Sequence, residues 1–343
     1  MKFSTLAMAA ATALTASLHV NAAPAGSMVI TINPGPQLVG LPLVNAPAHE
    51  ATITSATPGI WILDTAIEVP LDVDTRYFVE ITGGVSNTWI GERFELDVAA
   101  TIAAAAPSVH LEPNANLNTL NPGSIDPTGY TLAIRRHITL GQVFGTGENP
   151  RLIGTTSPST ADKVSLFDPA TQRFETYYLL RSPNGAIEQW TLIGGGSTNR
   201  DGTVIPPGAG VLVSRRAAQT SYLVLTGEVR PHAFAQPLVR GLNLVSEPFP
   251  RPHSPQTRGL SAANGFQGAT SPNAADQFHV LQDGRFTSFY LLRSPNGAIE
   301  QWTQIGGGTI SRNEQPLITP DSAVFLAKQS ADPDYFVPLS FTP

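Results

Sequence analysis

The sequence predicts an all-β protein made of tandem antiparallel β-sandwich or barrel-like units that derive from a degenerate repeat. Strand-sized runs rich in Phe, Tyr, Thr, Val and Leu alternate with Pro-, Gly- and Asn-containing turns, as in sandwiches and barrels. No amphipathic run is long enough for a stable helix. Finally, the stretch YLLRSPNGAIEQWT occupies residues 178–191 and recurs without change at 290–303.

The repeated stretch itself predicts a β-hairpin. Residues 174–181 are rich in aromatic and β-branched side chains that suit a pleated strand. Residues 182–185 read Ser-Pro-Asn-Gly, which favours a type I turn with Pro at its second position. Residues 186–193 then form the return strand, and 211–215 form a further strand after a Pro-Pro-Gly break. The only helical turns we expect lie within 99–106, before a proline.

The repeat extends beyond the hairpin and divides the chain. Residues 161–216 match 275–329, including a triple glycine after the hairpin. A more divergent copy precedes them, with Tyr77 and Trp89 in place of the repeated Tyr and Trp. The repeat predicts four segments along the chain: a signal peptide at 1–22, a first divergent β unit at 23–141 with an insertion near 98–120, a second β unit at 142–230 and a third at 231–343.

The N-terminus has the pattern of an export signal. Met1 and Lys2 form a short positive segment, residues 3–18 are apolar or small, and Val20-Asn21-Ala22 supplies small side chains before a cleavage site. No later stretch is long and apolar enough to span a membrane. We therefore expect an exported protein that resides in the periplasm, at the cell surface or outside the cell.

Composition excludes several classes of function. The 343 residues carry 20 Lys and Arg against 26 Asp and Glu, a net charge of −6, so the chain lacks the basic footprint of a nucleic-acid binder. The absence of cysteine excludes disulfides, Cys-ligated metals and thiol catalysis. No cofactor is implied.

The repeated hairpins supply the candidate ligand-binding residues. Because side chains alternate along a strand, Glu188, Trp190 and Leu192 share one face. Leu192 is replaced by Gln304 in the other copy, so this face tolerates a polar side chain. We therefore expect the tryptophan rings to be partly accessible to solvent. An aromatic platform for a sugar and a tryptophan covered by the protein both fit the pattern. The candidates are Tyr178, Arg181, Gln189, Trp190, Tyr290, Arg293, Gln301 and Trp302.

The identical sequences of the two hairpins have two interpretations. Polar positions such as Arg181, Asn184 and Gln189 are not fixed by packing, so their retention suits a repeated, bivalent contact surface. A recent duplication or conversion of the segment also preserves them, without any selection. In that second reading, Arg181 and Glu188 form only a weak cross-strand ion pair.

The sequence contains no catalytic or metal-binding motif. His49-Glu50 begins like a zinc-protease motif but lacks the second histidine. The other histidines are scattered, and we expect His137, His232 and His253 to be solvated or capping groups.

Two acidic groups have alternative interpretations. Asp72-Val73-Asp74 and residues 199–202 resemble fragments of a calcium loop, but ordinary turns explain both. Four acids are candidates for a pair of glycosidase carboxylates, whose separation the sequence does not show. These are Asp64, Glu68, Glu80 and Glu92.

Residues 240–250, which read RGLNLVSEPFP, resemble a strand element of secreted bacterial β proteins. With the Tyr-rich strand, the Trp, the Ile-x-Pro step and the closing strand that ends in Arg-Arg, the order resembles a family of signal-peptide-bearing, β-rich secreted bacterial proteins with degenerate internal repeats. The resemblance covers most of 30–330. The first unit departs through its insertion, and the third has Lys328-Gln329 in place of Arg-Arg. The resemblance implies export and β architecture and supplies no catalytic residue.

Three function hypotheses follow. The first is an exported, non-enzymatic surface or extracellular structural or interaction protein, with a polysaccharide or another surface protein as its partner. The second is a carbohydrate- or protein-binding module that uses the hairpins of Trp190 and Trp302. The third is an extracellular hydrolase.

Overall fold

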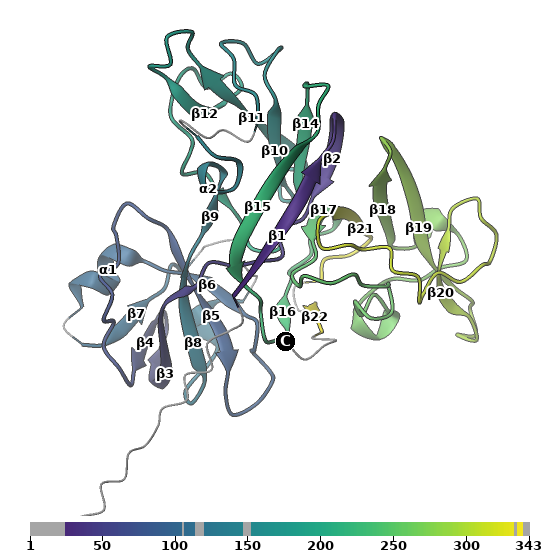
Figure 1. Cartoon of the computed structure of the whole chain (residues 1–343). Helices are drawn as coiled ribbons and strands as arrows, with labels where there is room; N and C mark the ends of the chain where they lie inside the picture. The colour runs from purple at the N-terminus through teal and green to yellow at the C-terminus, as the bar shows by residue number, and fades with distance from the viewer. Residues whose placement is uncertain (1–24, 105, 114–119, 147–151, 333–334, 339–343) are drawn as a thin grey trace, which may run out of the picture.

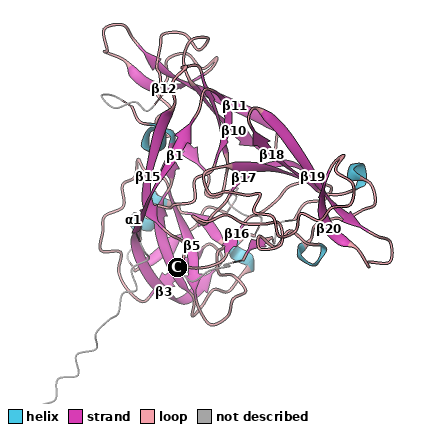
Figure 2. Cartoon of the chain, turned by 45° about the vertical axis from the view of Figure 1, so that its right-hand side comes forward, coloured by secondary structure: helices cyan, strands magenta, loops and turns pink. Residues whose placement is uncertain are grey.

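The computed structural model describes residues 25–104, 106–113, 120–146, 152–332 and 335–338. It confirms the all-β prediction: every pair of strands is antiparallel, and the helices are short (Figure 2). The two α-helices are α1 (Val98–Ala103) and α2 (Leu140–Phe144). The predicted signal peptide lies outside the described residues.

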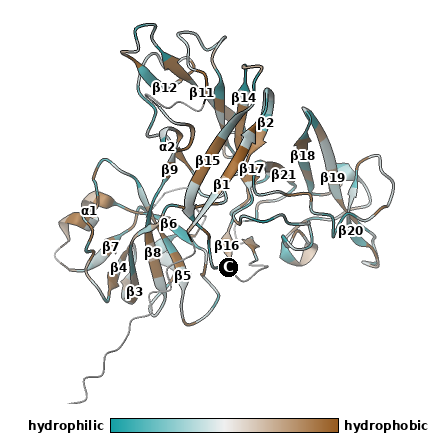
Figure 3. Cartoon of the chain, in the orientation of Figure 1, coloured by the Kyte–Doolittle hydropathy of each residue, from teal (hydrophilic) through white to brown (hydrophobic). Residues whose placement is uncertain are grey.

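Three modules radiate from a common centre (Figure 1). The first module, residues 47–136, is a six-stranded sheet in the order β6-β5-β8-β3-β4-β7. Its strands are β3 (Pro47–Thr57), β4 (Ile60–Leu63), β5 (Tyr77–Gly83), β6 (Arg93–Glu95), β7 (Ser108–His110) and β8 (Thr131–Arg136). A core around the fully buried Trp61 fills it, and Figure 3 shows hydrophobic residues along the strands that surround this core. The predicted insertion near 98–120 supplies α1, β7 and, in part, residues outside the described set.

The second module combines residues 25–44 with residues 138–228. Its five-stranded sheet has the order β12-β11-β10-β14-β2, and a β1–β15 ribbon packs over the same core. The strands of this module are β1 (Ala25–Ile32), β2 (Gly35–Val39), β9 (Ile138–Thr139), β10 (Lys163–Asp168), β11 (Arg173–Arg181), β12 (Glu188–Leu192), β13 (Val204–Ile205), β14 (Val211–Arg215) and β15 (Ser221–Glu228).

The first module is therefore inserted into the second. Although the sequence groups β1 and β2 with the first unit at 23–141, β2 pairs with β14 and β1 pairs with β15. Local sequence does not encode such pairing, because strands that lie next to one another in a sheet need not be neighbours along the chain.

The third module, residues 234–337, contains the second five-stranded sheet, in the order β17-β21-β18-β19-β20. Its strands are β16 (Phe234–Ala235), β17 (Gly241–Ser246), β18 (Gln277–Gln282), β19 (Arg285–Arg293), β20 (Glu300–Gln304), β21 (Ala323–Lys328) and β22 (Phe336–Val337). Short 3-10 turns lie at Pro122–Ser124, Ala262–Asn264 and Pro272–Ala274. A separate core surrounds Trp302.

The two five-stranded sheets share one strand pattern. Read from the hairpin edge, β12-β11-β10-β14-β2 corresponds to β20-β19-β18-β21-β17. The register agrees as well: Leu179 is opposite Trp190, as Leu291 is opposite Trp302.

A buried aspartate holds the same place in both sheets. Asp162 Oδ2 accepts a hydrogen bond from the backbone of Ile153 at 2.8 Å, and Asp276 Oδ2 accepts one from Gln267 at 2.8 Å. Each Oδ1 then accepts a bond of 2.7 Å from the residue just past β14 or β21. Polar positions thus correspond between the modules as closely as the strands do.

The second and third modules contact each other through corresponding residues. Gly40 N donates to Asp321 O at 3.1 Å, and Ser246 N donates to Gly208 O at 2.9 Å. Beside these bonds lies an inter-module cluster of apolar side chains, to which both modules contribute. Its members are Leu38, Leu244, Ala323 and Phe325, with Phe167, Leu212 and Leu281 packed against them.

Gly40 has no room for a side chain at this contact. A Cβ there lies 2.5 Å from Ser322 O and 2.6 Å from Pro320 O, both backbone atoms of the third module. We expect Gly40→Ala to lower the free energy of unfolding by about 1–3 kcal/mol, as overpacking does elsewhere. Denaturant unfolding measures the loss. Gly202→Ala, where nothing lies within 4 Å, is the control; equal stability of the two variants would contradict the prediction.

Candidate functional site

The two repeated hairpins form the same exposed turn. Ser182 Oγ donates to Asn184 Oδ1 at 2.7 Å, and Ile187 N donates to Ser182 Oγ at 2.9 Å. The other hairpin repeats both bonds at the same distances. Gly185 N donates to Ser182 O, which closes the predicted turn, and Gly185 has a positive φ of 70° that favours glycine. The turn residues from Pro183 to Ile187 are exposed.

The predicted cross-strand ion pair is present in both hairpins. Arg181 Nε lies 3.3 Å from Glu188 Oε2, and Arg293 Nε lies 3.4 Å from Glu300 Oε2. The arginines are about half exposed, so each pair stabilises the hairpin by only a few tenths of a kcal/mol.

The expectation of accessible tryptophan rings is wrong. Trp190 is 0 % exposed and Trp302 1 %. Each indole N–H donates to a backbone carbonyl of its own module, Gly145 O at 3.0 Å and Leu260 O at 2.6 Å. The Leu192/Gln304 exchange lies at the half-buried end of the strand, so it reports on the strand's end and not on its centre.

The other predicted binding residues do not gather with the indoles on an open surface. Tyr178 is buried, while Tyr290 is half-buried. The amides of Gln189 and Gln301 donate to Ser197 O and Thr309 O, which ties the loop after each hairpin to the strand. Of the predicted binding residues, only Arg181 and Arg293 have side chains that are exposed to solvent.

The solvated histidines of the sequence-based expectation are in fact buried. His137, His232 and His253 are 3 %, 6 % and 1 % exposed. Each lies beside a carboxylate: His137 Nε2 is 2.8 Å from Glu95 Oε2, and His253 Nδ1 is 3.0 Å from Glu247 Oε1. Sequence spacing gives no signal for these pairs, because the partner lies on another strand or segment.

Glu80, one of the four candidate glycosidase acids, is at the centre of a buried charge network. Its side chain is fully buried; Oε1 accepts from Arg230 Nε at 2.7 Å, and Oε2 lies 3.2 Å from Arg135 Nε. Burial by itself raises the pKa of this carboxyl, but Arg230, His232 and Arg135 outweigh it and lower the pKa to about 2. A glycosidase general acid keeps its proton through a raised pKa, so Glu80 does not fit that role, and both of its oxygens already face arginines.

The remaining candidate acids have separate surroundings. Asp64 is exposed, and the bond that its Oδ1 accepts from Thr52 N lowers its pKa. Glu68 is exposed and Glu92 is buried.

The calcium candidates are turns. Asp72 accepts bonds from Asp74 N and Thr75 Oγ1, and Asp201 accepts one from Trp190 N at 2.7 Å. Among the described residues no group of three or more His, Asp or Glu side chains is placed to hold a metal.

Arg93 joins all three modules. From the first module its Nη1 donates to Pro207 O of the second at 2.8 Å, and its Nη2 donates to Ala235 O of the third at 2.6 Å. Its guanidinium carbon lies 4.1 Å from the ring centroid of Phe234, over which Arg230 also lies, at 4.4 Å. Burial is the main effect that lowers the pKa of Arg93, yet an arginine stays protonated at neutral pH.

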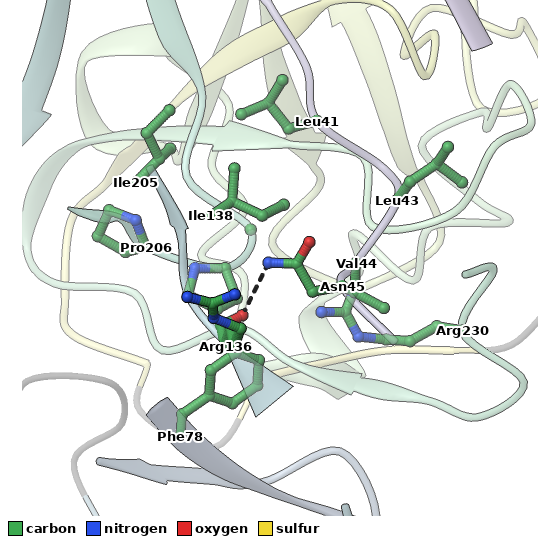
Figure 4. A pocket seen from close by; sticks show the side chains of 12 residues that line it. Leu41, Leu43, Val44, Asn45, Phe78, Arg136, Ile138, Ile205, Pro206 and Arg230 are labelled. Carbon is green, nitrogen blue, oxygen red and sulfur yellow. Dashed lines mark hydrogen bonds between the residues drawn. The ribbon is translucent and has the colours of Figure 1, made fainter. Parts of the chain in front are cut away.

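A small cavity of about 20 Å³ borders this network (Figure 4). Leu41, Val44 and Ile138 line it, and Asn45 donates to Arg136 O at 3.1 Å across one side. The volume suits one water molecule. Arg230 also borders it, and its Nη2 is buried with no hydrogen-bond partner among the described residues.

A much larger cleft, of about 760 Å³, opens where the three modules meet. The first module contributes β6, the second contributes the turn after β10 and Pro206-Pro207, and the third contributes β17. No sequence motif marks this cleft, because its walls come from segments that converge only in the folded chain.

Comparisons with known protein families, curated proteins and solved structures give no match. No helix in the described part of the chain is both long and apolar enough to cross a membrane.

The charge network predicts a defined acid sensitivity. Because the pKa of Glu80 is about 2 in the fold and 4.5 ordinarily, its stabilising effect is complete above pH 4.5 and is lost as pH falls towards 2. We expect Glu80→Gln to cost about 3 kcal/mol at pH 7, because it leaves the buried Arg230 without a carboxylate, whereas Arg135 keeps its pair with Glu228 at 2.8 Å. It should also flatten the decrease in stability between pH 4.5 and 2.

Urea unfolding across this pH range measures both effects. The control is Glu314→Gln, at an exposed position. Parent-like stability of Glu80→Gln at pH 7 would contradict the prediction.

Proposed function

We propose that this chain is an exported, non-enzymatic interaction protein of the cell surface or extracellular space that contacts a protein partner through its two identical hairpins. The observation that carries the proposal is that the exposed residues of the two hairpin turns are identical. Outside the identical run, even buried residues of the same two sheets have diverged.

The buried differences lie at matching register positions. Val164 is opposite Tyr177 in the second module, and Phe278 is opposite Phe289 in the third. Val213 likewise corresponds to Leu326: Val213 is opposite Val164 on β10, and Leu326 is opposite Phe278 on β18. If packing were the only constraint after a duplication, exposed positions would drift at least as fast as these core positions. Retention of the exposed turn supports a role for its surface.

The chemistry of the hairpin surface favours a protein over a polysaccharide. Ile187 is 41 % exposed and Ile299 45 %, next to the Arg–Glu pair of each hairpin. Exposed apolar groups with a charged rim are typical of protein contact surfaces. Sugar stacking needs an open aromatic face, and the indole of each hairpin is buried in its module.

Two copies also allow bivalent binding. The hairpins belong to the end strands β12 and β20, on separate modules (Figure 1). Engagement of the second hairpin after the first is intramolecular, which raises apparent affinity by about 10²–10⁴-fold when the geometry permits both contacts.

The test uses Ile187→Glu, Ile299→Glu and the double variant, with Ile102→Glu as a control at another exposed isoleucine. Binding of the labelled mature chain to cells of the source organism is measured by titration. We expect each single variant to lose at least about tenfold in apparent affinity and the double variant to lose binding altogether. If the double variant binds like the parent, the proposal is wrong, and duplication alone accounts for the identity of the two hairpins.

Export is tested separately. We expect the chain recovered from the extracytoplasmic or culture fraction to begin near Ala23, because a signal peptidase cleaves after small residues at −3 and −1. N-terminal sequencing of that fraction measures this. Recovery of a chain that still begins at Met1 would contradict export by this route.

A further inference from the structure

We infer that the cleft between the three modules binds an organic cation, an ammonium or guanidinium group attached to an apolar body. The inference is independent of the proposed function, because no residue of either hairpin turn lines the cleft. Its volume of about 760 Å³ lies within the range of natural ligand pockets.

The charged groups exposed on the described walls of the cleft are carboxylates. Glu112 and Glu175 are exposed there, and Glu175 Oε2 accepts a hydrogen bond from the Tyr177 hydroxyl at 2.7 Å. Asp168 is a third carboxylate, half-buried, whose oxygens accept bonds from Ala170 N and Thr171 Oγ1 in its own turn. Pro206 and Pro207, which also line the small cavity of Figure 4, have no N–H to donate.

Among the described residues that line the cleft, Arg93 is the single arginine, and its donors are already engaged. Arg93 is 1 % exposed, and its two terminal nitrogens donate to Pro207 O and Ala235 O. Because Arg93 is held within the junction, its charge does not pair with Glu112, Asp168 or Glu175 at the cleft. An anionic ligand would therefore meet three carboxylates without an available cation.

A buried acceptor adds an independent indication of a ligand. Gln236 is 8 % exposed and lines the cleft, and its Oε1 has no hydrogen-bond partner among the described residues. Buried acceptors are normally paired in proteins. A donor group on a bound cation would satisfy this oxygen while its apolar body contacts Leu244, Val245 and the prolines.

The experiment compares two sources of the same chemistry. Hexylguanidinium represents a free small molecule, and the blocked tripeptide Leu-Arg-Leu represents a segment of another protein. Hexanoate and the blocked tripeptide Leu-Glu-Leu are the anionic counterparts. Isothermal titration of the full mature chain at low and moderate salt measures binding of each.

Two variants test the location. Ala170→Trp places a large ring at an exposed position of the cleft, and Ala218→Trp makes the same change at an exposed turn elsewhere. Glu112→Gln removes one rim charge, with the exposed Glu50→Gln as its control. We expect Ala170→Trp to weaken cation binding at least about tenfold. Glu112→Gln should weaken it about two- to fivefold, with less effect at higher salt.

Tighter binding of hexylguanidinium than of the tripeptide identifies a small-molecule site, and the reverse identifies a peptide site. Three results would overturn the inference: no binding of either cation, equal binding of the anions, or unchanged affinity in Ala170→Trp. None of them bears on the hairpins, so failure here is distinguishable from failure of the proposed function.

Discussion

The arrangement of the three modules depends on buried charges at their junction. Glu80 lies between Arg135 and Arg230, and Arg230 shares the ring of Phe234 with Arg93. Moving such groups out of water is costly, so each is tolerated only while its partners stay in place. Glu80, Arg93 and Arg135 belong to the first module, Arg230 lies in the segment between the second and third, and Phe234 belongs to the third. Displacement of the first module would therefore leave the buried Arg230 without its carboxylate. The network therefore selects one arrangement of the modules, in addition to whatever stability it contributes.

Within this frame, the second and third modules differ in how their chains reach the same sheet. In the third module β17 is continuous with the rest of the sheet, whereas the corresponding β2 is separated from β10 by the whole first module. The chain leaves the second module after β2 and returns to it at β9, and both crossings lie at the junction. There Asn45 donates to Arg136 O, and Arg135 donates to Asn45 O at 2.7 Å. The same residues that begin and end the inserted module thus tie its base together.

Sequence reasoning recovers the features that local chemistry decides. The hairpin turn, the Arg181–Glu188 pair, strand 211–215 and the helical turns near 99–106 follow from propensity, turn residues and alternation. It fails where distant segments meet. The burial of Trp190 depends on Phe144 and Gly145 from a segment far upstream, and the partner of His232 is a carboxylate on β5. The cleft is the extreme case, since no single segment of its wall carries a motif.

The junction also determines the chemical character of the cleft. By donating to Pro207 and Ala235, Arg93 fixes two walls relative to the third, so the cavity is formed before any ligand arrives. The same two bonds occupy the terminal N–H groups of Arg93, so they are not available to a ligand in the cleft. The neighbouring prolines have no N–H to donate. The two hydrogen bonds by which Arg93 joins the modules thus also leave the carboxylates as the exposed charged groups of the cleft. The preference of this cleft for cations therefore follows from the same residues that hold the modules together.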